Sequence, residues 1–454
     1  MSNSVAAEAR VFRSASGSHL LIVDGSRVYD LPAAAASEIE RDLAPGADGA
    51  VARALLGDLM DGSRPRYIDD APLQPPPIFS LSLNVAQTCN MSCGYCYADS
   101  GKFGGTARLM PFDVAVASVD RLIAQSPPGA DLVLGFMGGE PLVNRKLVHS
   151  ITGYAADAAR RAGRRMRFSL TTNATLLEPE DARLFIDHRF QVAVSLDGDR
   201  MANDAVRPMR DGSGSYGRIV AGIELLQRDG RPAHLSARAT VTPRTGELLP
   251  ILDHLVGLGF DSAGFAAVLT SPDPALAFGE QDFGAFRRHM IDCGRKTLEA
   301  LLDGRSYPFS NFETALHEIH RGTHRPYPCG AGAGYLSVNA KGNLYACHRL
   351  LDDDKWAMGD VFSGPDDGRR AQHLSQSHVD RMEPCRSCWA RYLCGGGCYH
   401  EVQRRGRIGC DYIRGWLEFC LGAYVELSAA RPEYFDRSRR ERAMIEIEPA
   451  RTEG

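Results

Sequence analysis

The sequence predicts an α/β fold built on a partial (βα)6 barrel of the TIM type. From Leu81 onward, six short apolar segments alternate with stretches of helical periodicity, a pattern typical of parallel βαβ units. The segments are apolar enough to be covered on both faces, as strands of parallel sheets are. In such barrels the active site lies at the carboxyl ends of the strands, and here a cysteine-rich loop directly follows the first expected strand.

The 454 residues suffice for two to four domains. At the N-terminus, residues 18–32 predict two strands around an Asp-Gly turn, and residues 33–43 and 49–60 have helical spacing. Five prolines within residues 63–80 interrupt regular structure and predict a domain boundary near residue 70.

Strands and helices of the barrel can be placed by their periodicity. Helical spacing is clearest at 145–163 and 216–230. The strands are expected at 81–85, 131–137, 167–173, 190–196, 234–241 and 261–268. After about residue 308 the βα rhythm ends, and we expect metal to organise the cysteine-rich region that follows, because little regular core is indicated. The predicted units are residues 1–70, 76–308, 309–430 and a charged tail at 431–454.

The composition argues against several classes of partner. The 52 basic and 56 acidic residues are interspersed and the net charge is -4, so nothing resembles the basic surface of a nucleic-acid-binding protein. No apolar run is long enough to span a membrane, and no secretory signal is recognisable. We therefore expect a cytoplasmic protein. Because a reducing compartment disfavours disulfides, the twelve cysteines are expected to be metal ligands or catalysts.

Three cysteines lie close together after the first strand. Cys89, Cys93 and Cys96 have the spacing C-x3-C-x2-C, and Tyr95 precedes the third. They could hold zinc together with a fourth ligand from elsewhere in the chain. A [4Fe-4S] cluster held by three cysteines would instead leave one iron with an open coordination site.

This triad and the GGEP motif at 138–141 resemble the radical S-adenosylmethionine (SAM) superfamily. The resemblance implies that the open iron chelates SAM and that SAM cleavage yields a 5′-deoxyadenosyl radical, while the protein binds, orients and shields these groups. Residues at the strand ends, which could otherwise cap the next helices, are then expected to bind SAM: Tyr95, Gly138, Gly139, Glu140, Thr171, Asn173, Ser195, Asp197 and Arg207.

Three of these expectations are specific. The two glycines would let the backbone approach the methionine amino group, and Glu140 would accept a hydrogen bond from it. Arg207, or alternatively Arg210, would pair with the methionine carboxylate, since a guanidinium matches a carboxylate bidentately.

Seven further cysteines between residues 329 and 410 resemble the SPASM extension of radical SAM peptide-modifying enzymes. This extension binds two auxiliary [4Fe-4S] clusters, which gives three clusters in total. Cys410 is preferred over Cys420 as the late ligand. By position, one cluster would take Cys385, Cys388, Cys394 and Cys410.

The second auxiliary cluster is expected at Cys329, Cys347 and Cys398. No cysteine lies in the segment just before Cys329, where some family members carry a further ligand. The fourth site of this cluster is therefore expected to be open, and able to bind a substrate thiolate, or to be filled by a residue such as His320 or His324.

The residue after Cys347 bears on the reaction. Sulfatase-maturing relatives carry an aspartate there, as the base in oxidation of a serine or cysteine to formylglycine, whereas this chain has His348. The Cys-His segment resembles maturases that form thioether bonds, of the quinohemoprotein amine dehydrogenase small-subunit type or the ranthipeptide type. His348 is thus the candidate catalytic residue, with a packed or capping histidine as the alternative.

The N-terminal unit resembles the small winged-helix element that binds leader peptides of ribosomal precursors. Such an element captures an extended peptide by adding it as a strand to a sheet edge. The alternative is a structural cap on the barrel.

Together these features predict a radical SAM/SPASM enzyme that forms Cys sulfur-to-carbon thioether crosslinks within a ribosomally made peptide or small protein subunit. The implied partners are this precursor and an electron donor such as flavodoxin or ferredoxin. Other radical modifications remain as alternatives: a carbon-carbon crosslink, epimerisation or formylglycine formation. From a different class, a zinc-organised peptide-binding scaffold is the remaining alternative.

Overall fold

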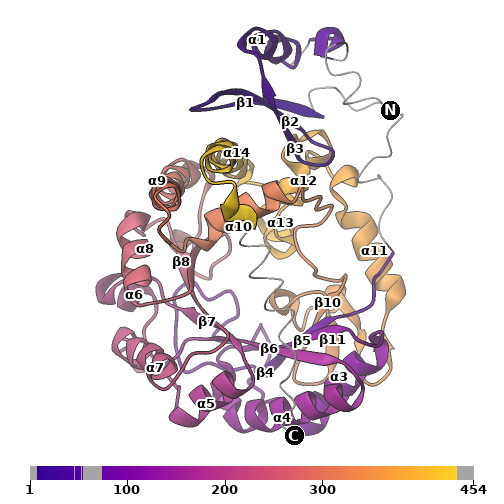
Figure 1. Cartoon of the computed structure of the whole chain (residues 1–454). Helices are drawn as coiled ribbons and strands as arrows, with labels where there is room; N and C mark the ends of the chain where they lie inside the picture. The colour runs from indigo at the N-terminus through magenta and orange to yellow at the C-terminus, as the bar shows by residue number, and fades with distance from the viewer. Residues whose placement is uncertain (1–7, 45–46, 53, 55–73, 437–454) are drawn as a thin grey trace, which may run out of the picture.

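The computed structural model of the chain describes residues 8–44, 47–52, 54 and 74–436 (Figure 1). The described strands form two sheets, one of three antiparallel strands near the N-terminus and one of ten strands. Figure 1 shows the small sheet at one end of the molecule, with the last helix, α14 (Cys410–Ala430), between it and the large sheet. Helix α14, which carries Cys410 and Cys420, therefore lies between the two sheets.

Six parallel strands form the barrel, and all six were expected from the sequence. They lie in sequence order within the sheet. Their bounds are β4 (Ser80–Ala86), β5 (Asp131–Gly138), β6 (Arg165–Thr172), β7 (Gln191–Ser195), β8 (His234–Val241) and β9 (Ser262–Ala267). Each begins and ends within two residues of its expected position, and the α/β barrel fold is thereby confirmed.

Helices cover the outer face of the barrel (Figure 1). The strands bury alternate apolar side chains, such as Leu83, Leu134 and Val192, in one core with these helices. The covering helices are α3 (Phe112–Gln125), α4 (Arg145–Arg161), α5 (Pro179–Asp187), α6 (Arg200–Val206), α7 (Tyr216–Arg228), α8 (Leu248–Gly257) and α9 (Phe283–Leu302). Because the outer face is apolar and covered, polar strand residues are left for the inner face.

The region after residue 308 has more regular structure than expected. Strand β10 (Tyr335–Val338) pairs in parallel with β4, and β11 (Asn343–Tyr345), β12 (Ala357–Asp360) and β13 (Gly364–Pro365) continue the same sheet. The expectation of little regular core was wrong, because pairing with a strand some 250 residues earlier in the chain leaves no local signal.

Helices also contribute to this region. Helix α10 (Ser310–His320) packs against α14, and α14 packs against α9. Trp416 and Leu417 of α14 are buried in the main core. Helix α11 (Asp367–Ser377) follows, and the short helices α12 (Arg391–Cys394) and α13 (Tyr399–Arg405) carry or adjoin cysteines. The predicted division near residue 308 therefore separates two parts that share one sheet and one apolar core.

The N-terminal sheet has three strands, of which two were expected. They are β1 (Ala9–Ser14), β2 (Gly17–Ile22) and β3 (Arg27–Leu31), followed by α1 (Ala33–Asp42). Strand β1 was missed; it contacts α14, where Arg10 pairs with Glu418 at 3.0 Å. The boundary near residue 70, most of the helix expected at 49–60 and most of the charged tail lie outside the described residues.

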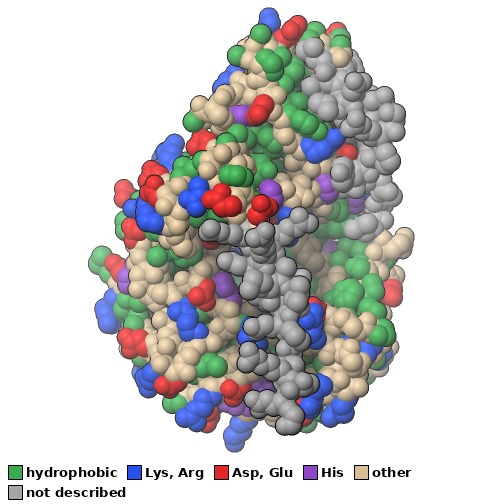
Figure 2. All heavy atoms as spheres, in the orientation of Figure 1, with side chains coloured by type: hydrophobic (Ala, Val, Ile, Leu, Met, Phe, Trp, Pro, Cys, Tyr) green, Lys and Arg blue, Asp and Glu red, His purple; other side chains and the backbone are tan. Residues whose placement is uncertain are grey.

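The surface agrees with the balanced composition. Figure 2 shows basic and acidic side chains interspersed over the visible face. Among the described helices, none combines the length and apolar character that a membrane-spanning segment needs.

Candidate active site

A cavity lies at the carboxyl ends of the barrel strands. Residues of β5 to β9 form one wall, the loop after β4 forms another, and residues 348, 349 and 401 of the C-terminal region line the rest. The predicted site residues on its lining are Cys89, Cys93, Cys96, Tyr95, Gly138, Gly139, Thr171, Asn173, Ser195, Arg207 and His348. Of the residues predicted to bind SAM, Glu140 and Asp197 are not on the lining.

The thiols of the triad are set in a buried loop. Burial raises the pKa of Cys89 to about 12, and Glu140 adds to this rise. A buried thiol keeps its proton at neutral pH unless a cation takes the proton's place. The Cys89 sulfur also accepts hydrogen bonds from the Met91 backbone, at 3.4 Å, and the Asn173 amide, at 3.7 Å. Such donors stabilise a thiolate, the form that binds metal.

The donor set fits an iron-sulfur cluster. Three thiols of one short loop face the same cavity. In the described part of the chain, no three His, Cys, Asp or Glu side chains lie where they could hold a single metal ion. A zinc ion holds its thiolate sulfurs at about 2.3 Å. A four-iron cluster is wider than one ion, so the thiolates that bind it stand further apart from one another. Three cysteines on one cavity lining are the ligands that such a cluster takes.

The cavity wall beside the triad also fits an anionic ligand. Arg207 is buried and donates to the Tyr95 hydroxyl at 2.6 Å. Its Nε is buried without a hydrogen-bond partner among the described residues. A buried unpaired donor is costly, and a carboxylate such as that of SAM would satisfy it. Arg210, the alternative, is exposed, donates to Thr88 at 3.3 Å and is absent from the lining.

Asp197 lies behind Tyr95 and does not line the cavity, so its expected contact with SAM stays a prediction. Its carboxylate accepts from the Tyr95 hydroxyl at 2.5 Å and from the Thr240 backbone at 2.7 Å. Burial raises the pKa of Asp197, and the nearby Arg207 opposes that rise. Asp197 thus fixes Tyr95, and through it Arg207, and has no face on the cavity.

Glu140 is likewise a positioning residue. Its side chain is fully buried and accepts hydrogen bonds from the Leu142 backbone at 3.1 Å, the Thr172 hydroxyl at 2.8 Å and the Asn173 backbone at 2.7 Å. Burial raises its pKa to about 7, and the bond from Asn173 is the largest opposing effect. Oε1 accepts two of these bonds and Oε2 accepts one, so the expected bond from the SAM amino group to Glu140 stays a prediction.

The substitution Glu140→Gln is expected to lower the stability of the protein. A glutamine offers one acceptor oxygen, and its amide group would face an N–H donor, so at least one of the three bonds is lost at a cost of about 1–3 kcal/mol. Urea unfolding of both proteins measures the difference. An unchanged midpoint would mean that these bonds do not hold the ends of β5 and β6 together.

The two glycines line the cavity, but their missing side chains make room for protein. A Cβ at Gly138 would collide with the Ala86 carbonyl, and one at Gly139 with the Thr88 carbonyl. Gly138 also has φ of 153°, which disfavours other residues. They let the end of β5 pack directly on the segment that leads into the triad.

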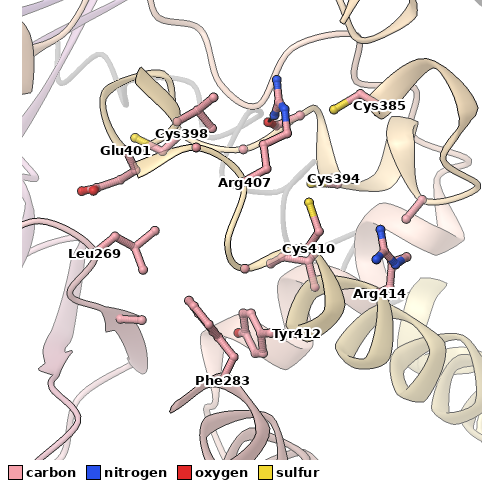
Figure 3. Close-up of a pocket in the computed structure, with 18 of the residues that line it drawn as sticks. Leu269, Phe283, Cys385, Cys394, Cys398, Glu401, Arg407, Cys410, Tyr412 and Arg414 are labelled. Carbon is pink, nitrogen blue, oxygen red and sulfur yellow. Dashed lines mark hydrogen bonds between the residues drawn. The ribbon is translucent and has the colours of Figure 1, made fainter. Parts of the chain in front are cut away.

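Seven of the other nine cysteines fall into two groups, and the first group consists of Cys385, Cys388, Cys394 and Cys410. Cys410 lies near the thiols of the first group, whereas Cys420 is fully buried in the core with no thiol identified beside it. Figure 3 shows Cys385, Cys394 and Cys410 on one side of a pocket and Cys398 with Glu401 on the other.

The second group consists of Cys329, Cys347 and Cys398, which influence one another electrostatically. His320 and His324 do not join it. They line a different cavity, between β3, the end of α10 and α14. The structure thus gives no support to either histidine as the fourth ligand.

His348 lies beside this group. Its Nδ1 is 3.7 Å from the Cys347 sulfur and 3.4 Å from the Tyr335 hydroxyl. Burial lowers the pKa of His348 to about 3, and Arg349 adds to this effect. The ring is therefore neutral at physiological pH, and it can accept a hydrogen bond but holds a proton weakly.

Four residues at this end of the cavity were missed from the sequence. Tyr97 follows Cys96 and is also close to Cys347 and Cys398, so it lies between the triad and the second group. The guanidinium of Arg349 lies 4.5 Å from the Tyr97 ring and pairs with Glu401. The fourth is Arg238, on β8. Tyr97 and Arg349 each follow a predicted site residue in the sequence, which is a weak signal that they belong to the site. Glu401 and Arg238 lie in no motif that could have indicated them.

Comparisons with known proteins agree with this geometry. Residues 83–247 match the model of the radical SAM superfamily. The chain is similar to a serine-type anaerobic sulfatase-maturating enzyme of Klebsiella aerogenes, with 28% identity over 76% of this chain and 85% of the relative.

Solved structures share the fold. The structure of anSMEcpe with bound AdoMet, which is SAM, has a TM-score of 0.68 and 19% identity over 78% of this chain and 96% of that one. Streptococcus suis SuiB bound to its precursor peptide SuiA has a TM-score of 0.52 and 14% identity over 88% and 97%. The matched segment contains the triad, most of β4 and strands β5 to β8, and this part of the chain is therefore a radical SAM domain built on a mostly parallel α/β sheet.

Proposed function

We propose that this chain is a radical SAM enzyme that modifies a side chain of a peptide or small protein, and that the product is a thioether between a cysteine sulfur and a carbon of the same substrate. The observation that carries the proposal is the shared cavity. The triad lines one part of it, and His348, Arg349 and Glu401, which adjoin two cysteines of the second group in sequence, line another.

Different residues of the chain have different roles in this proposal. The triad would hold the SAM-binding cluster, and the two further groups would hold auxiliary clusters, three in all. The cluster held by the triad and SAM, bound together, would supply a 5′-deoxyadenosyl radical that takes one hydrogen atom from the substrate. Arg207 would bind and orient the SAM carboxylate, while the strand ends and Tyr97 exclude water from the space between.

Thioether formation removes two hydrogens from the substrate. One leaves the carbon as a hydrogen atom, the thiol loses the other as a proton, and the sulfur-carbon bond forms as one electron leaves. We propose that the auxiliary clusters accept this electron, and that a reduced flavodoxin or ferredoxin supplies the electron for SAM cleavage. The three-cysteine group supports a place for the substrate thiolate, because the two candidate histidines line another cavity.

The test uses the reduced enzyme with SAM and candidate precursor peptides encoded beside its gene. The expected product is lighter by two hydrogens and has one thiol that iodoacetamide no longer alkylates. A product that keeps all its thiols reactive contradicts thioether formation, whereas a failure to form 5′-deoxyadenosine in any condition contradicts the radical SAM activity itself.

Formylglycine formation is the second candidate, because the relative from Klebsiella aerogenes is named a sulfatase-maturating enzyme. A formylglycine product carries an aldehyde that hydrazides label, which a thioether does not. The weakly basic His348 favours the thioether, since it follows Cys347 where sulfatase-maturing relatives are expected to carry an ionisable base.

The N-terminal sheet is proposed to bind the substrate peptide. Strand β3 lies at an edge of this sheet, and its residues line a cavity together with the end of α10 and α14. An edge strand offers unpaired backbone groups to an extended peptide. SuiB, whose structure is similar, is described with a bound precursor peptide.

Peptide binding at this edge is expected to protect the backbone amides of Arg27–Leu31 from hydrogen exchange. Added strand pairing would engage those amides of β3 that point away from β2. Mass spectrometry of the exchanged fragments measures the effect, with and without the precursor peptide. Protection confined to the barrel cavity would instead favour the structural-cap interpretation of this unit.

A further inference from the structure

Arg238 is an unusual residue of the cavity wall. Among the residues that the described strands contribute to the cavity lining, Arg238 is the only one with a charged side chain. Arg238 lies on β8, in register with Ser195 of β7, and its side chain keeps an exposed surface that opens into the cavity. A guanidinium that opens into a cavity can bind an anion there through charge-assisted hydrogen bonds.

The structure provides no such anion from the described residues. No hydrogen bond or ion pair engages the Arg238 guanidinium there, and its strongest charged neighbour is another cation, Arg349; burial and Arg349 lower the pKa of Arg238. Glu401 is the sole carboxylate on the described lining, and it is taken by Arg349 and by the Thr270 hydroxyl at 2.6 Å.

The other arginines of the wall differ from Arg238. Arg349 pairs with Glu401 and stacks on Tyr97, and Arg207 donates to Tyr95 beside the triad. The free Nε of Arg207 gives the SAM carboxylate a place on the triad side. Arg238 instead acts electrostatically on His348, at the end of the cavity near the second cysteine group.

We propose that Arg238 binds a carboxylate of the peptide or protein substrate, an aspartate or glutamate side chain, and so sets which residue enters the cavity. The proposal rests on the proposed function for the nature of the substrate. A planar guanidinium binds a carboxylate through two parallel hydrogen bonds, which fixes the direction of the acidic side chain as well as its position. The acidic residue would then lie between the triad and the second cysteine group.

Equilibrium binding tests the proposal without turnover. Two dye-labelled octapeptides, each with one cysteine and blocked ends, differ at one position, glutamate against glutamine, so that one of them carries a single carboxylate. Each is titrated by fluorescence anisotropy into anaerobic, SAM-loaded holoenzyme. We expect the glutamate peptide to bind the unaltered enzyme about tenfold or more tightly than the glutamine peptide, as a charge-assisted bidentate contact should.

Three variants complete the design. Arg238→Gln is expected to abolish the preference for glutamate, and Arg238→Lys to retain part of it. Arg244→Gln is the matched control, because Arg244 is exposed just beyond the end of β8 and does not line the cavity; it should keep the full preference. Circular dichroism and iron content show that each variant is folded and loaded.

SAM affinity separates the two sources of a carboxylate. Equilibrium dialysis with radiolabelled SAM should give the same Kd for Arg238→Gln as for the unaltered enzyme. A weaker SAM affinity with an intact glutamate preference would assign Arg238 to SAM and overturn the proposal. Absence of the preference in the unaltered enzyme would overturn it too. Formation of 5′-deoxyadenosine is measured separately, so a failed proposed function is distinguishable from a failed carboxylate site.

Discussion

Replacement of Cys89, Cys93 and Cys96 together by alanine is expected to abolish SAM cleavage completely. The three thiols face the cavity from one loop, and no other described thiol lies on its lining to replace them. Iron in the reconstituted protein should fall from about twelve to about eight atoms per chain, because one four-iron cluster is lost. Iron analysis and chromatography of 5′-deoxyadenosine measure the two effects.

The matched control is Cys293→Ala. Cys293 is fully buried in α9 and contacts the apolar core. Its substitution should leave both iron content and SAM cleavage unchanged, at a modest cost in stability. If the triple variant kept twelve irons, or if it still formed 5′-deoxyadenosine, the assignment of the triad to the SAM-binding cluster would be wrong.

The second large effect is expected at Cys410. Its thiol lies with those of Cys385, Cys388 and Cys394, at the start of α14. Cys410→Ala should lower the iron content by up to about four atoms and lower the unfolding midpoint, because metal binding contributes folding free energy in such a region. SAM cleavage should persist, since the triad is intact, while peptide modification should stop.

Cys420→Ala on the same helix is the comparison. Its thiol is fully buried among apolar residues, so the substitution should cost about 1–2 kcal/mol through lost packing and leave the iron content unchanged. The reverse outcome, with iron lost in Cys420→Ala and kept in Cys410→Ala, would require α14 to turn so that a core residue faces the cysteines. Loss of SAM cleavage in Cys410→Ala would contradict the separate roles of the clusters.

The sequence predicted the barrel well because its signals are local. Apolar runs such as 131–137 and 234–241 mark strands wherever their partners lie, and parallel strands order themselves through short helical connections. Pairing of β10 with β4 was not predicted, since it joins segments that are 255 residues apart. Site residues in the cysteine and GGEP motifs, and those near the strand ends, could be named from the sequence, whereas Glu401 and Arg238 could not.

The sequence by itself determined the positions of the strands, the number and spacing of the cysteines, and the resemblance that these carry. Only the tertiary structure decided which polar residues face the cavity. Glu140 and Asp197 lie behind its wall and hold neighbouring elements, while Arg238 faces into it without a counter-charge from the described residues. The physical reason is that a side chain's partners depend on the packing of elements far apart in the chain, whereas motif spacing and periodicity are properties of adjacent residues.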